Sequence, residues 1–69
     1  MRHRRMIGEA IRSHRKLAGY TQERLAELVG LNSKYLGEIE RGEKIIAIAA
    51  LLRIAKAVKT AMPEFFRDL

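Results

Sequence analysis

The chain has 69 residues, no cysteine and a formal net charge of +6. This length allows one small domain, and the lack of cysteine excludes disulfides and thiolate metal sites. His3 and His14 are too few histidines to suggest a zinc site, so neither a metal nor another cofactor is expected. A hydrophobic fraction of 48% is typical of a compact helical domain, and the excess of basic residues favours a polyanionic partner.

The beginning of the chain combines a basic segment with a helical pattern. Residues 1–5, which read MRHRR, are expected to form a basic N-terminal arm. A frayed, solvated arm is the first interpretation, and contact with DNA is the alternative. Apolar residues such as Ile7 and Ile11 then recur at helical spacing and predict a helix over residues 6–17. His14 shares that apolar stripe, and we interpret it as a partly buried neutral histidine rather than a ligand.

The next part of the chain contains two short amphipathic patterns separated by a glycine. The first pattern predicts a helix over residues 21–29. Gly30 stops it where a sharp turn needs a positive φ, which a residue without Cβ reaches most easily. A second helix is predicted over residues 33–40, with Leu36 and Ile39 pointing inward. Helix, tight turn and helix is the arrangement that places the second helix in a DNA major groove.

The chain after residue 42 carries one further amphipathic pattern and then a break. Apolar residues between Ile48 and Val58 share a helical face, with basic residues outside it, and predict a helix over residues 47–58. Pro63 stands near the first turn of a last short helix over residues 62–67. This part is too short and too charged to span a membrane, and we expect it to pack on the core rather than on a membrane surface.

Five residues in this sequence have the types and the spacing of a known motif: Gln22, Ala26, Gly30, Leu36 and Ile39. In these positions the chain resembles the helix-turn-helix of phage repressor and Cro-like (XRE-type) regulators. The run Glu40-Arg41-Gly42 is similar to the usual closing sequence of that family. The resemblance covers roughly residues 7–66.

The resemblance implies an all-α fold, a five-helix bundle of the lambda-repressor-like DNA-binding domain type, with residues 1–69 as a single domain. The implied function is sequence-specific binding of double-stranded DNA by a cytoplasmic transcriptional regulator, with repression as the expected outcome. The chain departs from the family at Ile45-Ile46-Ala47, where relatives usually have a polar or proline-containing loop followed by a helix cap.

Matching the motif position by position implies a set of site residues. Ser33, Lys34 and Glu38 are expected at base edges, where Lys34 can donate to guanine and Glu38 can accept from cytosine N4. Arg15 and Glu40 match positions that form an internal salt bridge in related repressors. The residues expected to contact phosphates are Gln22, Asn32, Tyr35, Arg41 and Lys44, although simple solvated charge is an equal alternative for Arg41 and Lys44.

The resemblance also implies a homodimer on an inverted-repeat operator. One recognition helix reads only a few base pairs, and related regulators place two helices in successive major-groove faces. More apolar residues follow residue 44 than a small core can bury, and an exposed apolar patch usually marks an interface. The expected interface residues are Ile45, Ile46, Met62, Phe65, Phe66 and Leu69, with one of the two phenylalanines closing the core instead.

Two other classes of function are less well supported by the residues. The sequence contains no Ser/His/Asp or Cys/His set, metal constellation or phosphate-binding glycine loop, so an enzyme is not expected. A protein-interaction or antitoxin-like module that keeps the fold with little DNA specificity is the open alternative. Polar residues at the groove-facing positions and the positive charge argue against it.

Overall fold

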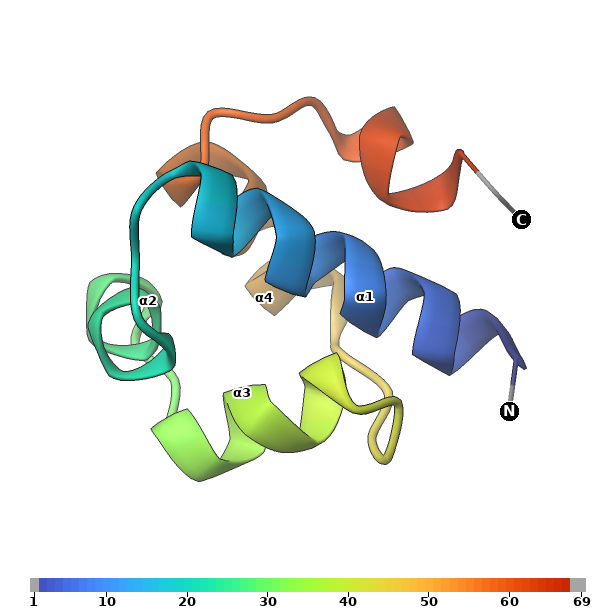
Figure 1. Cartoon of the computed structure of the whole chain (residues 1–69), viewed down its shortest axis with the longest axis horizontal. Coiled ribbons are helices and arrows are strands. Elements are labelled where there is room, and N and C mark those ends of the chain that lie inside the picture. Colours follow the sequence, from blue (N-terminus) through green and yellow to red (C-terminus); the bar gives the residue numbers. More distant parts are fainter. Residues whose placement is uncertain (1, 68–69) are drawn as a thin grey trace.

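The computed structural model describes residues 2–67, in which every regular element is helical (Figure 1). Four α-helices are followed by a short 3-10 helix: α1 (Arg2–Leu17), α2 (Gln22–Val29), α3 (Ser33–Glu40), α4 (Ile48–Ala57) and η1 (Met62–Phe66). The predicted all-α fold is confirmed, but the fifth element is not the α-helix that was predicted. The N–H of Glu64 donates to the carbonyl of Ala61, three residues earlier, at 3.0 Å. With Pro63 in its first turn and only five residues, η1 is a tight 3-10 turn.

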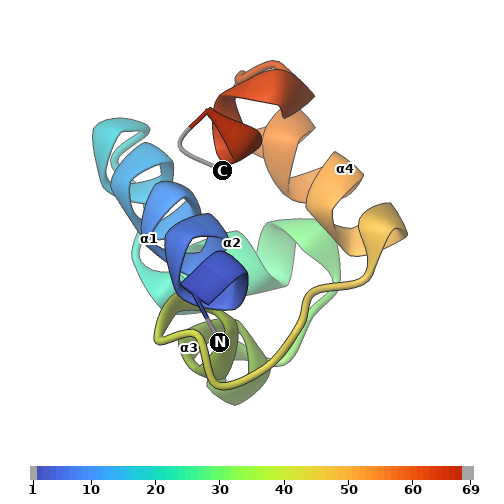
Figure 2. The ribbon, with the colours of Figure 1, turned by 90° about the vertical axis from the view of Figure 1, so that its right-hand side faces the viewer.

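α1 begins four residues before the predicted helix, so residues 2–5 form its first turn rather than a frayed arm. The connection from α3 to α4 runs past the beginning of α1 (Figure 2). Within it, Gly42 packs directly on α1, because a Cβ on Gly42 would lie 2.8 Å from the Cα of Arg5. Basic residues are unfavourable at the positive end of a helix dipole, so this tertiary contact supports a first turn that local chemistry disfavours. Leu69, which was expected at the dimer interface, lies outside the described residues.

The core lies where α1, α2, α3, α4 and η1 meet. α1 packs against α3 and η1, α2 packs against α3 and α4, and α4 also packs against η1. Phe65 of η1 is 2% exposed and closes this core, and its ring meets the half-buried ring of His14 edge-on at a centroid distance of 5.4 Å. The largest fully buried side chains are Ile11, Leu25, Leu36, Ile39, Leu51 and Ile54. No helix within residues 2–67 is long and apolar enough to cross a membrane.

α1 and α3 touch through their backbones at Gly8. A Cβ on Gly8 would overlap the carbonyl oxygen of Ile39 and would lie 2.8 Å from that of Glu40. A residue with a side chain would therefore push the two helices apart. This close approach brings the following turns of α1, which carry Ile11 and Arg15, against the end of α3.

The turn between α2 and α3 has the predicted conformation. Gly30 has φ 73° and lies in the left-handed region, which confirms the need for glycine there. The N–H of Leu31 donates to the carbonyl of Ala26 at 2.8 Å and closes the helix end. Arg53 of α4 adds a clamp from outside the motif, because its Nε donates to the carbonyl of Val29 at 2.8 Å. The angle between α2 and α3 is thus supported by α4 as well as by the turn itself.

Candidate nucleic-acid interface

α3 has a buried face and a face that reaches solvent. Leu36 and Ile39 are 0% and 1% exposed and anchor the helix in the core. Lys34 is exposed, and Ser33 and Glu38 are half-buried. The three side chains predicted to contact bases therefore lie outside the core, and they offer an ammonium, a hydroxyl and a carboxylate.

The beginning of α3 is organised by Asn32. Its Oδ1 accepts from the backbone N–H of Lys34 at 2.7 Å and from that of Tyr35 at 3.4 Å, so Asn32 is the N-cap. The amide nitrogen of Asn32 takes no part in the cap and can still donate to a phosphate. The hydroxyl of Tyr35 donates to the carbonyl of Ile45 at 3.3 Å, which ties α3 to the connection that follows it.

The end of α3 carries a buried ion-pair network. Arg15 binds Glu40 through two hydrogen bonds, from Nε to Oε2 at 2.7 Å and from Nη2 to Oε1 at 3.0 Å. The same guanidinium donates from Nη1 to the carbonyl of Tyr20 at 2.9 Å. Gln22 completes the network, because its Nε2 donates to Oε1 of Glu40 at 3.0 Å. The pair expected from the resemblance therefore also positions Gln22, the first residue of α2, a role that sequence reasoning missed.

A second ion pair follows on the surface. Arg41 donates from Nε to Oε2 of Glu43 at 2.8 Å and from Nη2 to Oε1 at 3.3 Å. The hydrogen bonding between these two side chains, together with the attraction between their charges, raises the pKa of Arg41 and lowers the pKa of Glu43. Arg41 was expected to face a phosphate or solvent, and here it faces a neighbouring carboxylate. Lys44 beyond it is exposed.

A polar cavity of about 310 Å³ lies between α1, the beginning of α2 and the end of α3. We call it the arginine cavity; it is lined by Arg12, Arg15, Gln22, Glu40 and Arg41. Gly37 makes room for two of these side chains, since a Cβ on Gly37 would lie 3.2 Å from Nη1 of Arg41 and 3.4 Å from Oε1 of Gln22. Sequence reasoning assigned Arg12 no role. The available signal was its spacing of three residues from Arg15, which places both on one side of a helix.

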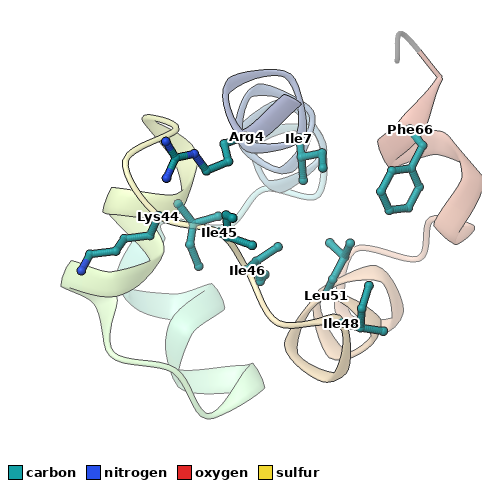
Figure 3. Close-up of a pocket in the computed structure, with 9 residues that line it drawn as sticks. Arg4, Ile7, Lys44, Ile45, Ile46, Ile48, Leu51 and Phe66 are labelled. Carbon is teal, nitrogen blue, oxygen red and sulfur yellow. The ribbon is translucent and has the colours of Figure 1, made fainter. Parts of the chain in front are cut away.

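An apolar groove of about 260 Å³ lies on another face of the protein. It is lined by Arg4, Ile7, Ile39, Lys44, Ile45, Ile46, Ile48, Leu51 and Phe66. Figure 3 shows the apolar side chains of α1, α4 and η1 around this groove, while the charged ends of Arg4 and Lys44 point away from it. Ile45 and Ile48 are 70% and 62% exposed at its edge.

The predicted dimer interface needs a correction at one position, Ile46. Ile46 is 9% exposed and belongs to the core, although it also lines the apolar groove. Phe65 is 2% exposed and is the one phenylalanine of the two that closes the core, as expected. Met62 and Phe66 are half-buried. Sequence reasoning placed Ile48 on the inward face of its helix, whereas that residue is exposed. The apolar face of α4 is wider than the area that its neighbours cover.

Comparisons with known proteins agree on the family. A sequence profile of the helix-turn-helix family (HTH_3) matches residues 11–65. The control protein C.SmaI of Serratia marcescens is 37% identical over 59 residues, which cover 86% of this chain and 70% of that protein. The HTH-type transcriptional regulator YazB of Bacillus subtilis is 40% identical over 57 residues, which cover 83% of each chain.

Solved structures extend the agreement to the fold. The restriction-modification controller protein C.AhdI from Aeromonas hydrophila superimposes with a TM-score of 0.90 at 32% identity, over 96% of this chain and 100% of that one. The family profile, the curated relatives and this structural match all point to the same conclusion. The chain belongs to the helix-turn-helix family and is a DNA-binding transcriptional regulator of the XRE, lambda-repressor-like type.

Proposed function

We propose that this regulator acts in the cytoplasm and represses transcription. It would bind an inverted-repeat operator as a homodimer, with α3 of each copy in the major groove. The observation that carries the proposal is the division of α3 into two faces. Leu36 and Ile39 hold the helix in the core, and Lys34 on the other side is exposed. A helix held in this way can enter a groove about 12 Å wide while its core contacts stay in place.

The base contacts proposed for α3 follow from the chemistry of three side chains. Lys34 donates to O6 and N7 of guanine, Glu38 accepts from N4 of cytosine, and Ser33 suits either kind of partner. Glu38 would be repelled by the phosphates unless it finds such a donor. The proposal therefore includes a preference for cytosine at the base pair that Glu38 reaches.

The proposed phosphate contacts lie around α3 on several segments: Gln22, Asn32, Tyr35, Arg41 and Lys44. The amide groups of Gln22 and Asn32 each keep a donor that no described contact uses. Tyr35 and Arg41 would exchange their present partners, the carbonyl of Ile45 and the carboxylate of Glu43, for a phosphate oxygen. These contacts position the protein and carry no sequence information.

Two observations support the dimer. The longest extent of the chain is 27 Å, shorter than the roughly 34–36 Å between successive major-groove faces on one side of the duplex, so one copy cannot reach both. The apolar groove also carries Ile45 and Ile48, two large apolar side chains that are 70% and 62% exposed and line the same apolar surface. The proposed interface is formed by Ile45, Ile48, Met62 and Phe66. Ile46 and Phe65 are left out of it because both belong to the core.

The match to C.AhdI over the whole of that chain supports a narrower version of the proposal, in which this regulator also controls restriction-modification genes. Mapping the sites that it occupies in its own cells checks this version. The proposed sites lie beside genes for a restriction endonuclease and its methyltransferase. Sites that lie only beside other genes contradict the narrower version and leave the DNA-binding proposal intact.

Selection of bound sites from a random pool of duplex DNA tests the proposal. The parent should select an inverted repeat whose half-sites are centred about 34–36 Å apart. Replacing Lys34 with Ala should relax the preference at one base pair per half-site by about 1–3 kcal/mol and leave the other positions unchanged.

Three results would contradict parts of this proposal. An unpaired half-site, bound by one copy of the protein, contradicts the dimer. Equal stringency at every position in the parent and in the Lys34→Ala variant contradicts the role of α3. Binding without any sequence preference would favour the protein-interaction or antitoxin-like alternative.

A further inference from the structure

The arginine cavity joins α1 to the two helices of the motif. Arg12 and Arg15 come from α1, Gln22 from the beginning of α2, and Glu40 and Arg41 from the end of α3. All five side chains that line it are polar or charged. A group that occupies this cavity must therefore be polar as well, because an apolar group would leave these donors without hydrogen bonds.

The charges around the cavity favour an anion. Arg15 already neutralises Glu40 through two hydrogen bonds. Arg41 shares its charge with Glu43 in an exposed pair. Arg12 forms no ion pair within residues 2–67 and is exposed, so its charge has no described partner. The guanidinium of Arg12 is thus left to bind an acidic group of another molecule.

Hydrogen-bond donors converge on the same place. The side-chain amide of Gln22 donates one of its two N–H groups to Glu40, and the second N–H group is left to donate to another acceptor. Gln22 is the first residue of α2, so the positive end of that helix dipole lies at the cavity. Gly37 lets the amide of Gln22 and the guanidinium of Arg41 lie close together. An anion with several oxygens, such as a phosphate, matches donors that arrive from several sides.

We propose that the arginine cavity seats a backbone phosphate of duplex DNA and that Arg12 of α1 binds this phosphate, which extends the DNA contact beyond the helix-turn-helix. The inference rests on the proposed function, since Gln22 and Arg41 are proposed phosphate contacts there. A free phosphate ion offers the same oxygens. The DNA backbone is the better source because the cavity adjoins the proposed interface through both of those residues.

The test compares Arg12→Gln with Lys56→Gln, a variant that loses the same charge from an exposed position on α4 away from the cavity. The dissociation constants of the parent and of both variants are measured over a range of salt concentrations, for the selected operator and for an unrelated duplex. Arg12→Gln should weaken binding to both duplexes by the same factor and lower the slope of log K against log salt by about 1. Lys56→Gln should leave the slope as it is in the parent. Both variants should keep the Tm of the parent, since both residues are exposed.

The outcomes separate this inference from the proposed function. If Arg12→Gln keeps the slope of the parent while Lys34→Ala still changes the selected site, the phosphate seat is wrong and the proposed function stands. An unchanged slope together with an Arg12-dependent rise in Tm on adding inorganic phosphate, at constant ionic strength, assigns the cavity to the free ion and overturns the DNA contact. A parent that binds neither duplex overturns both.

Discussion

Two arginine–glutamate pairs lie at the end of α3, and burial separates their roles. The closest nitrogen–oxygen distances are nearly the same, 2.7 Å for Arg15–Glu40 and 2.8 Å for Arg41–Glu43. The side chains of the first pair are 8% and 1% exposed, whereas those of the second are 58% and 53% exposed. The same chemistry can therefore hold helices together in one pair and stay exchangeable in the other.

The two ion pairs differ in how much water surrounds their charges. Both charges of Arg15–Glu40 have lost water, and their mutual attraction largely offsets the cost of that desolvation. If either partner were removed, the other charge would stay buried with nothing to offset this cost. The charges of Arg41–Glu43 keep much of their water and are screened by salt, so the pair contributes little to the free energy of unfolding. A phosphate can therefore replace Glu43 at Arg41 far more easily than it can replace Glu40 at Arg15.

Removing Glu40 should have the largest effect. Glu40→Ala leaves the buried Arg15 guanidinium without a carboxylate partner and should lower the free energy of unfolding by about 3–5 kcal/mol. Urea denaturation measures this loss. The double variant Arg15→Met/Glu40→Leu is the control and should recover part of the stability, because no charge is then left buried. A single variant that unfolds at the same urea concentration as the parent would show that the pair is not structural.

Gly8→Ala should have the next largest effect, because it breaks the contact that brings α1 to the buried pair. The added Cβ meets the backbone carbonyls of Ile39 and Glu40, which cannot move without shifting α3. Overpacking of this kind costs about 1–3 kcal/mol, more than the helix propensity of alanine returns. Gly37→Ala is the matched control in α3. Its neighbours are the ends of flexible side chains, so it should unfold no more easily than the parent. Equal denaturation midpoints for the two variants would refute the close approach.

Glu43→Gln should have the smallest effect on stability and a visible effect on DNA binding. The variant frees Arg41 and removes a negative charge, so binding to any duplex should tighten relative to Glu27→Gln, which breaks another exposed pair. Affinity at two salt concentrations measures this difference. If the two variants bind equally well, Glu43 does not compete with phosphate for Arg41.

The effect of pH on the same pair follows from the pKa of Glu43. Arg41 lowers that pKa through the hydrogen bond first and through its charge. The contribution of the pair to stability is therefore present above the pKa of the unfolded chain and is lost as the pH falls through the lower folded value. The unfolding free energies of the parent and of Glu43→Gln should converge over that acid range, and a gap that widens there contradicts the pairing.

Much of the fold could be predicted from local signals. Apolar spacing placed α2, α3 and α4 within about two residues of their ends, and Gly30 marked the turn between the first two. The beginning of α1 could not be predicted, because its basic first turn depends on a tertiary contact with Gly42. The 3-10 form of η1 was missed because a segment with apolar residues around one proline reads equally well as a short α-helix.

The candidate site could be predicted only where a motif matched residue by residue. The resemblance pointed to Lys34, which is exposed on α3, and to the ion pair of Arg15 and Glu40. It could not identify Arg12, whose proposed role depends on neighbours from two other helices. Periodicity also showed that α4 has an apolar face but not how much of it other elements cover, which is why Ile48 was misplaced.

The clamp between Arg53 and the carbonyl of Val29 has a consequence for the energetics of recognition. It joins α4 to the last turn of α2, at the junction that sets the direction of α3. A recognition helix already held in its binding orientation loses little conformational entropy when it meets DNA. Most of the interaction energy of α3 can then appear as affinity instead of being consumed by ordering the protein.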